Sequence, residues 1–434
     1  MEEEIIKYLR KARTMVVSTQ GEKLWSTKVF YAMDQGFLFL VEKDSLTLQN
    51  LTKTPELSFA IDFNKPDLFI QGSGKVEVLG EPKDHDRERG ILLYKIPEDA
   101  LFVHFQRVLI VRLIPSRIKV TDMRVAPKHY DAEYELKDLY ESRKSALFRA
   151  TRYWSFQQSV SALIIGSLLA FHINFLYLIL SIIGLILAHG AFNVISDYYD
   201  YKHKIDTGVS LGGSRMLSDK IITPNAQKYL GISLLLLAIV IGSYLIFVRP
   251  AIVPFVIIGF IPGILYGIPK IALRAHALGD LAVFVAFGPG IVLGGTVLQG
   301  GAVTIPSLLI SFAFGFLIVD ILHGNNWRDI KTDLQVKVRT VANLLGDKGS
   351  EIYYLVLLWL SYPLVIFSMI LNHKYYPFIF SILSIPWAYS LTKIAMTKEH
   401  SKKWLLDLYT ANFTMIFSIC IIVPFCILWA LNLI

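Results

Sequence analysis

The chain has 434 residues, of which 54% are hydrophobic and 18% charged, and its mean hydropathy is +0.49. This composition is too apolar for an ordinary soluble protein and indicates a membrane protein. On such a protein a net charge of +8 is typical of basic cytoplasmic loops rather than of nucleic-acid binding. The two cysteines, Cys420 and Cys426, lie in the last apolar run, which excludes a disulfide framework or a cysteine-rich metal site. The N-terminus is acidic and has no apolar run, so we expect no signal peptide.

Residues 1–125 differ in composition from the rest, with short β-rich runs separated by turn residues such as those at 34–36. Two polar runs, about 44–52 and 82–95, have the character of helices. The segment predicts a small soluble α+β domain, a β-barrel or sandwich with helices at its edge. The expected strands are 15–19, 25–33, 37–41, 57–63, 68–79, 101–115 and 118–122.

Residues 126–150 are strongly charged and predict a linker that becomes helical near the membrane surface. From about 151 the apolar runs are long enough to cross a bilayer core of roughly 30 Å. We therefore expect a two-domain protein whose C-terminal part, 151–434, is an all-α polytopic domain of about nine transmembrane helices. The expected spans are 155–172, 174–196, 228–248, 251–267, 280–298, 305–323, 351–371, 376–393 and 408–431.

Basic residues set the expected orientation, because cytoplasmic loops carry an excess of Lys and Arg. They occur in the loops after the second, fourth, sixth and eighth spans, whereas the opposite side carries little beyond Arg249 and Lys374. We therefore expect a multi-pass protein of the cell membrane, with the N-terminal domain and these loops on the cytoplasmic side.

Two polar clusters close two of the apolar runs, and both fall on the predicted cytoplasmic side. Carboxylates at the end of a membrane helix are costly and indicate a functional site. Members of each cluster are three or four positions apart, so on a helix they share one face. The clusters are Asn193, Asp197 and Asp200, followed by Asp206, and Asn326, Asp329 and Asp333.

Carboxylate and amide oxygens are ligands that Mg²⁺ accepts, usually with substrate phosphates completing its shell. Two facing clusters can hold Mg²⁺ bridged by a diphosphate, while neighbouring Arg and Lys side chains clamp phosphate oxygens. Metal and cations would stabilise the diphosphate as it leaves, and the membrane would shield a carbocation from water. The simpler alternative is that the clusters are ordinary charged helix ends, which two similar clusters on one side disfavour.

Residues 151–434 resemble the UbiA superfamily of intramembrane prenyltransferases, whose signature is two Asp-rich motifs on nine helices. Within it they are most similar to the 1,4-dihydroxy-2-naphthoate polyprenyltransferase branch of menaquinone synthesis. The chain departs from the pattern at Val194, where Asp is common, and at Tyr153, where the branch has Pro. The matching stretches are 193–200, 206–207, 212–215, 265–267, Lys270, Arg274, 278–289, 299–300, 325–333, 339–342 and 345–346.

The resemblance implies Mg²⁺-dependent transfer of a polyprenyl group from a prenyl diphosphate to an aromatic acceptor, expected to be 1,4-dihydroxy-2-naphthoate. Catalytic roles fall on Asn193, Asp197, Asp200, Asp329 and Asp333, and the four aspartates are the expected metal ligands. The residues expected to bind substrate are Asp206, Arg215, Tyr266, Lys270, Asn326, Arg328, Lys331 and Arg339. Other acceptors stay open: 4-hydroxybenzoate, another quinone precursor or a glycerol-phosphate lipid. A transporter or lipid-binding protein that uses its acidic residues for ions is a further alternative.

Residues 1–125 resemble the pyridoxamine 5′-phosphate oxidase-like split barrel at 25–29, 45–51, 54–58 and 71–76. The resemblance implies a split β-barrel that often binds a flavin at a dimer interface, although other members bind deazaflavin or heme. The sequence shows no clear Arg/Lys cluster that would cradle a flavin phosphate. A flavin and a role as a scaffold or homodimerisation module therefore both stay open.

Three further polar residues lie inside predicted spans. His189 lies one turn before Asn193, and we expect a packed intramembrane histidine, with orientation of a ligand as the alternative. Asp320, with His323 one turn later, is deeper than interfacial charges usually sit. A polar pocket or a proton role is one reading, and pairing with His189 or another buried polar group is the other.

Overall fold

The computed structural model describes residues 2–62, 68–105, 107–122, 139–204, 213–267, 271–335, 338–398, 403–431 and 433. These residues form two compact units, which divide between Leu147 and Phe148. The N-terminal unit also includes the segment Arg215–Thr223, which lies far along the chain. The other described residues after Leu147 form the helical unit.

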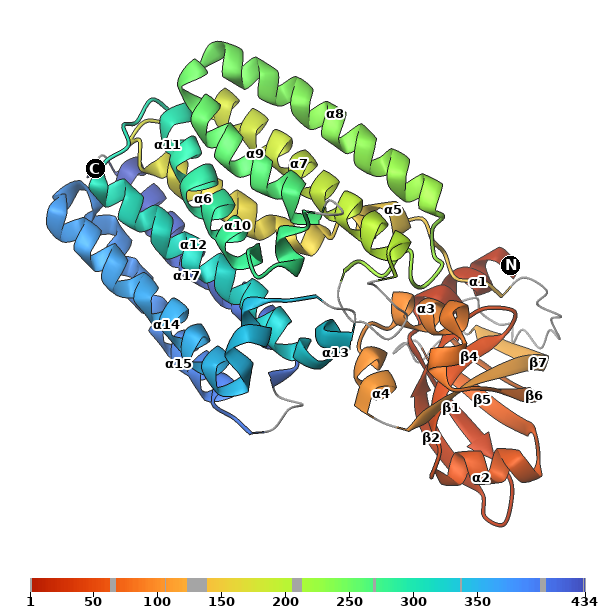
Figure 1. Ribbon diagram of the computed structural model, residues 1–434. Helices are drawn as coiled ribbons and strands as arrows, with labels where there is room; N and C mark the ends of the chain where they lie inside the picture. The colour runs from red at the N-terminus through yellow and green to blue at the C-terminus, as the bar shows by residue number, and fades with distance from the viewer. Residues whose placement is uncertain are drawn as a thin grey trace. The chain divides into compact units, whose positions relative to one another are not determined.

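The N-terminal unit is built on a curled seven-stranded sheet in the order β2-β1-β5-β6-β7-β4-β3, with every pairing antiparallel (Figure 1). Successive side chains of a strand point to opposite faces, and in β1 Met15, Val17 and Thr19 are buried while their neighbours are not. One face of the sheet therefore forms the core, and the predicted split-barrel class is confirmed. The strands are β1 Thr14–Thr19, β2 Trp25–Phe30, β3 Ala32–Met33, β4 Phe37–Glu42, β5 Glu56–Asp62, β6 Leu68–Gly80 and β7 Val108–Asp122.

Helices accompany this sheet, and two details differ from the sequence prediction. Residues 101–105, predicted as strand, belong to helix α4, and β7 then runs without interruption through Pro115. Proline is tolerated there because the register of β6 and β7 shifts between Ser73 and Gly74, which places Pro115 at an irregularity of the ladder. The helices are α1 Glu2–Lys11, α2 Leu46–Lys53, η1 Pro82–Asp84, α3 Asp86–Lys95 and α4 Asp99–Phe105.

The helical unit contains the apolar part of the chain. Its first helix, α5, begins before the division between the units. The elements are α5 Ala146–Ala150, η2 Tyr153–Ser155, α6 Phe156–Leu168, α7 Phe175–Lys202, α8 Pro224–Val248, η3 Pro250–Ile252, α9 Val253–Gly267, η4 Leu273–Ala275, α10 Gly279–Val285, η5 Ala286–Leu293, α11 Gly294–Leu298, α12 Ile305–Arg328, α13 Ile330–Gln335, α14 Val341–Leu371, η6 His373–Ser384, α15 Ile385–Ala395 and α17 Leu406–Ala430.

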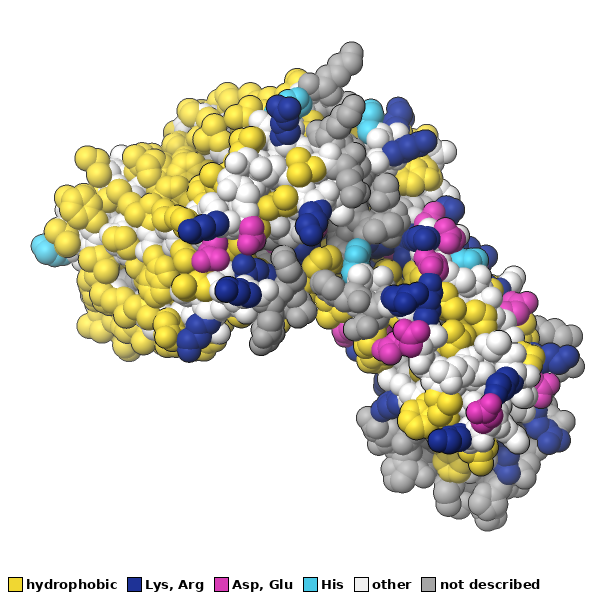
Figure 2. Space-filling model, turned by 60° about the horizontal axis from the view of Figure 1, so that its bottom comes forward, with side chains coloured by type: hydrophobic (Ala, Val, Ile, Leu, Met, Phe, Trp, Pro, Cys, Tyr) yellow, Lys and Arg dark blue, Asp and Glu magenta, His cyan; other side chains and the backbone are white. Residues whose placement is uncertain are grey.

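Among the described residues, eight helices are long and apolar enough to cross a membrane, and they coincide with eight of the predicted spans. The remaining predicted span, 155–172, contains α6, whose 13 residues extend about 20 Å and are too short to cross a bilayer core alone. On the face drawn in Figure 2, hydrophobic side chains cover most of the helical unit. Such a surface suits contact with lipid, so the chain is a multi-pass membrane protein.

Helix α12 is the most enclosed of these helices and ends at the second carboxylate cluster. It begins at Thr304, whose side chain caps the N–H of Ser307, after a turn in which Gly300 has a φ of 90°. The predicted break between two apolar spans is therefore confirmed here. Its fully buried residues include Ile310, Ala313, Phe314 and Leu317.

Candidate active site

The first carboxylate cluster occupies the end of α7, where the long apolar run gives way to charged residues. Asn193, Asp197 and Asp200 lie within this one helix, so their spacing puts them on a common face. Both aspartates are buried, with exposed fractions of 4% and 1%. Buried carboxylates require partners, because the loss of hydration is costly.

Arginines supply these partners. Arg152 forms an ion pair with one carboxylate oxygen of Asp197, and the backbone N–H of Ser214 donates to the other at 2.9 Å. Arg274 forms an ion pair with Asp200. Arg152 has a φ of 55°, which is uncommon for a residue other than glycine, so its placement beside α7 is imposed by the surrounding structure.

Asn193 is held by its amide group. Its Nδ2 donates to the carbonyl of Thr151 at 3.0 Å and to Ser155 Oγ at 3.2 Å. Ser155 Oγ is also 3.2 Å from Nε2 of His189, whose Nδ1 is 2.6 Å from Ser159 Oγ. His189 is therefore a packed histidine, and through Ser155 it also helps to orient Asn193.

The sequence predicted that the second cluster lies on one continuous helix, and this prediction is wrong. Helix α12 ends at Arg328, and Asp329 is its C-cap with φ −93° and ψ 9°, while Asp333 lies in α13. The negative end of the helix dipole disfavours an acidic residue inside the last turn, which is a reason for the helix to stop here. The N–H of Asp333 nevertheless donates to the Asp329 carbonyl at 2.9 Å, so the local turn is kept.

Arg328 is fixed between two carboxylates. Its Nε and one terminal nitrogen each donate to Asp329 at 2.9 Å, and the other terminal nitrogen donates to Asp407 at 2.9 Å. Asn325 Nδ2 donates to the same oxygen of Asp407 at 3.2 Å. These contacts use three of the five N–H donors of the Arg328 guanidinium.

The loop between α9 and α10 links the two clusters. Arg274 contacts Asp200 of the first cluster. Directly after it, backbone hydrogen bonds of 3.1 and 2.7 Å join Ala275 and Ala277 to Arg339, which follows the second cluster. One loop thus contacts the first cluster through a side chain, and its backbone is hydrogen-bonded to the residue that follows the second cluster.

Arg274 also lies near carboxylates of both clusters. Its guanidinium lies within electrostatic range of Asp197 and Asp333, one from each cluster. Burial, and then the charge of Arg152, lower the pKa of Arg274 to about 10, so it stays charged at neutral pH. The Tyr266 hydroxyl lies within electrostatic range of Asp280, Arg152 and Asp333.

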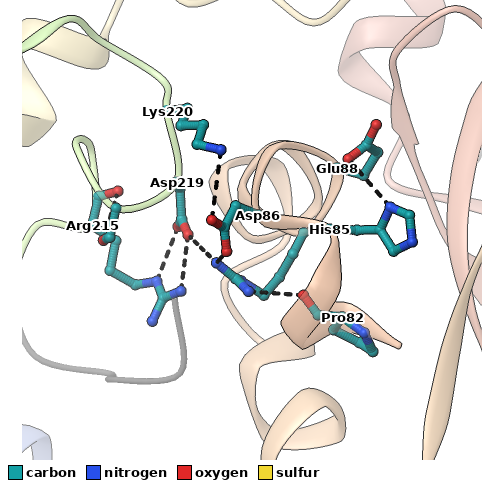
Figure 3. A network of polar contacts seen from close by, with 9 residues as sticks. Pro82, His85, Asp86, Glu88, Arg215, Asp219 and Lys220 are labelled. Carbon is teal, nitrogen blue, oxygen red and sulfur yellow. Dashed lines mark hydrogen bonds and ion pairs between the residues drawn. The ribbon is translucent and has the colours of Figure 1, made fainter. Parts of the chain in front are cut away.

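The other predicted substrate residues are dispersed. Arg215 pairs with Asp219 (Figure 3) and belongs to the N-terminal unit. Lys331 and Arg339 are exposed, and Asn326 is half-buried. Asp206 and Lys270 lie outside the described residues.

Three residues at the site were not among the predicted ones. Arg152 and Arg274 lie beside apolar spans, and a search for counter-charges to Asp197 and Asp200 would have singled them out. Asp407 lies in the first turn of α17 and gives no signal near the second cluster in the sequence, because only folding brings it to Arg328.

A second buried polar group lies inside the helical unit. Asp320 and His323 are fully buried, and neither has a hydrogen-bond partner among the described residues. His323 Nδ1 is 3.8 Å from a carboxylate oxygen of Asp280, and its ring packs edge-on against Tyr353 with centroids 4.7 Å apart. The expected alternative of pairing with His189 is wrong, since that histidine is bound by serines.

The carboxylates fit Mg²⁺ only together with substrate oxygens. Among the described residues no three His, Cys, Asp or Glu side chains converge as a metal site. Mg²⁺ needs no such cage, because it is usually bound through one or two carboxylates plus phosphate oxygens and water. Asp197 and Asp200 on one side, and Asp329 and Asp333 on the other, supply that chemistry.

The N-terminal unit has a cavity of about 270 Å³, lined by Met33, Asp34, Ile91, Tyr140, Glu141 and Arg143. This is below the usual 300–1,000 Å³ of a cofactor pocket. Asp34 is fully buried and is already paired with Arg87. The two carboxylates in the lining do not suit a flavin phosphate.

The helical unit carries two carboxylate clusters and a loop with an arginine beside them. These groups are typical of a polytopic membrane protein whose ligand is an anion that binds together with a divalent cation. The UbiA prenyltransferase family model matches residues 159–416, more than half of the chain. The chain belongs to this family, and the family prediction is confirmed.

Several known proteins are similar to parts of this chain. UbiA prenyltransferase domain-containing protein 1 of Homo sapiens is 30% identical over 263 residues, covering 58% of this chain and 76% of the human protein. The structure of a UbiA homolog from Archaeoglobus fulgidus bound to GPP and Mg²⁺ has a TM-score of 0.47 at 14% identity, over 64% of this chain and 100% of that one. A structure assigned to a pyridoxamine 5′-phosphate oxidase from Listeria innocua has a TM-score of 0.23 at 16% identity, over 27% of this chain and 96% of that one.

The finer expectations are not confirmed by these relatives. None of them identifies the 1,4-dihydroxy-2-naphthoate branch, so they do not assign the acceptor. No flavin in the N-terminal unit is supported either.

Proposed function

We propose that the chain transfers a prenyl group from a prenyl diphosphate to an aromatic acceptor within the membrane, in a Mg²⁺-dependent reaction. The observation that carries the proposal is Arg274, which pairs with Asp200 of the first cluster and lies in range of Asp333 of the second. This arrangement supports placing both clusters in one site, and the chain belongs to a prenyltransferase family. A dihydroxynaphthoate is the first acceptor to test, as the sequence motifs favour, in a quinone-forming role.

In this proposal Asp197, Asp200, Asp329 and Asp333 hold Mg²⁺ against the diphosphate. The metal, when bound, supplies Lewis-acid stabilisation of the negative charge on the leaving group. With these carboxylates on the metal, Arg274 and Arg152 would be available to phosphate oxygens. Because these cations are already in place and largely dehydrated, little reorganisation is needed as charge develops.

The reaction breaks the bond between C1 of the prenyl group and the diphosphate oxygen, and the electron pair leaves with the diphosphate. The allylic cation accepts electrons from an aromatic carbon of the acceptor, and a new C–C bond forms. A ring proton is lost, or for a naphthoate the ring carboxylate leaves as CO₂. Tyr266, in range of Asp333, can present its ring face to the cation.

The test uses the full chain in detergent or nanodiscs with Mg²⁺, a prenyl diphosphate and dihydroxynaphthoate. We expect diphosphate release together with a prenylated product detected by mass spectrometry. Asp197→Asn and Asp329→Asn should each lower turnover by at least a hundredfold. Full turnover in both variants would overturn the assignment of the two clusters.

The acceptor is decided by a panel of dihydroxynaphthoate, 4-hydroxybenzoate and a glycerol-phosphate lipid under the same conditions. A product with the first supports the proposed acceptor, and a product with only another compound reassigns it while leaving prenyl transfer in place. We further propose that the N-terminal domain and the active-site loops are cytoplasmic, as the basic loops favour. Labelling of an introduced Cys in the N-terminal unit by a membrane-impermeant reagent, in intact cells and in lysed cells, tests this orientation.

A further inference from the structure

We propose that Asp280 receives the hydroxyl proton of the aromatic acceptor, and that His323 and Tyr353 position its carboxylate. The inference rests on the proposed function and adds a catalytic residue that lies outside the two carboxylate clusters. All residues that carry it belong to the helical unit.

Asp280 lies in the first turn of α10, next to residues of the candidate site. The residue before it, Gly279, packs closely against the end of α9 and the following loop. A Cβ atom at Gly279 would lie 3.1 Å from Cα of Arg274 and 3.5 Å from the ring of Tyr266. The Tyr266 hydroxyl is within electrostatic range of both Asp280 and Asp333. Asp280 is therefore a neighbour of the residues that are proposed to contact the prenyl diphosphate and the allylic cation.

Side chains of two other helices face the Asp280 carboxylate. Nδ1 of His323, on α12, is 3.8 Å from one of its oxygens. The hydroxyl of Tyr353, on α14, is within hydrogen-bonding reach of the same carboxylate. The rings of His323 and Tyr353 pack edge-on against each other, with centroids 4.7 Å apart. Three helices thus determine the position of one acidic group.

The group lacks hydrogen bonds that its buried atoms require. Among the described residues, one carboxylate oxygen of Asp280 and both ring nitrogens of His323 have no hydrogen-bond partner. Asp280 is only 5% exposed and His323 is fully buried. Buried polar atoms are nearly always hydrogen-bonded, so these exceptions indicate a role in binding or catalysis. A ligand that carries an O–H donor would supply the bond that the Asp280 oxygen lacks.

Asp320 extends this polar group toward the middle of the membrane. It lies one turn before His323 on α12, so the two side chains share a face of the helix. Asp320 is fully buried, neither of its carboxylate oxygens has a hydrogen-bond partner among the described residues, and it is within electrostatic range of Asp280. About 12 Å of helix separate it from the end of α12 at Arg328. Ionisable groups at such a depth are typical of sites that hold or pass on protons.

The proton transfer makes the acceptor ring more electron-rich before it reacts. The O–H bond of the acceptor breaks, its proton goes to the Asp280 carboxylate, and the electron pair stays on the phenolate oxygen. The ring carbon then attacks C1 of the prenyl group, and the phenolate becomes a ketone. Loss of the ring proton to the diphosphate, or of CO₂ from a naphthoate, restores the aromatic ring and returns the electron pair to the oxygen. This oxygen recovers its proton from Asp280, so the carboxylate is regenerated.

The test separates ionisation of the prenyl diphosphate from transfer to the acceptor, in the full chain with Mg²⁺. With saturating dihydroxynaphthoate, kcat for the prenylated product should fall at least a hundredfold in Asp280→Asn, and Asp280→Glu should recover part of the loss. Without acceptor, water captures the cation and no base is needed, so the slow release of diphosphate should stay within threefold of wild type. KM for the prenyl diphosphate should change less than twofold. His323→Gln should show the same separation with a loss of about tenfold in transfer.

The matched control is Ser311→Ala, which removes another fully buried polar group of α12, whose hydroxyl donates to the Leu308 carbonyl at 2.8 Å. Both of its rates should stay within twofold of wild type. Unchanged transfer in Asp280→Asn would overturn the inference, and so would an equal loss of transfer and of acceptor-free release, which indicates a structural role. If wild type forms no prenylated product with any acceptor, the proposed function fails and the inference fails with it, an outcome that the wild-type sample alone identifies.

Discussion

Substitution of Arg274 by Gln removes the side chain that joins the two carboxylate clusters. Asp200, which is 1% exposed, loses its ion pair, and Asp197 and Asp333 lose a cation within electrostatic range. In the proposed reaction, the diphosphate loses one fixed donor. Removal of a single preorganised donor of this kind costs about 3–4 kcal/mol in the transition state, or about 10²–10³ in rate.

We therefore expect kcat/KM for the prenyl diphosphate to fall about 100- to 1,000-fold in Arg274→Gln. Arg274→Lys should retain more activity, because it restores the charge although not the bidentate geometry. The measurement is initial-rate diphosphate release at fixed Mg²⁺ and acceptor. Arg249→Gln is the control, since Arg249 donates to the Val297 carbonyl and lies outside both clusters.

The same substitution makes a separate prediction for stability. An unpaired buried carboxylate costs about 3–5 kcal/mol, so Arg274→Gln should unfold at lower temperature than wild type without ligand. Mg²⁺ with prenyl diphosphate should raise its melting temperature more than that of wild type, because the metal replaces the missing positive charge at Asp200. A variant with kcat/KM within threefold of wild type and the same Mg²⁺ response would refute the placement of Arg274 at the shared site.

Three further predictions concern other parts of the structure. Asp407→Asn weakens one of the two carboxylate contacts of Arg328 and should lower kcat/KM about tenfold, measured by diphosphate release. Gly166→Val would place a Cβ 2.0 Å from a backbone carbonyl of η5, and it should lower the melting temperature by several degrees, whereas Gly242→Ala, with nothing within 4 Å, should not. Burial raises the pKa of Asp99 from 3.8 to about 7, so the folded protein binds this proton more tightly than the unfolded chain does. The free energy of unfolding therefore decreases as the pH rises from about 4 to 7. Asp99→Asn should therefore stabilise the protein at pH 8 by up to about 4 kcal/mol but not at pH 4, as denaturant unfolding at the two pH values will show.

Most of the fold follows from periodicity. Apolar runs of about 20 residues have few alternatives to membrane helices, and short β-rich runs bounded by turn residues are typical of strands. The errors occur where local and tertiary preferences compete. Residues 101–105 are apolar enough for a strand but form α4, and Pro115 interrupts the sequence pattern of β7 but not the strand itself. The break at Asp329 was missed because its spacing from Asp333 also fits a continuous helix.

The site could be predicted only in part for a related reason. Asn193, Asp197 and Asp200 are close in sequence, and a single helix settles their geometry. Their counter-charges are not local: Arg152 comes from the start of the helical unit and Arg274 from a later loop. Pairing between distant residues leaves no periodic signal, so it is visible only in the folded structure.

The pairing of the clusters explains why the proposed reaction should depend on a metal. Asp197, Asp200 and Asp329 are each neutralised by an arginine of their own, so the ligand-free site carries little net charge. A diphosphate alone would have to compete with these carboxylates for the arginines and would meet their repulsion. A divalent cation removes the conflict, because the carboxylates turn to the metal while the arginines become available to phosphate oxygens. In the proposed reaction we therefore expect metal and diphosphate to bind together rather than separately.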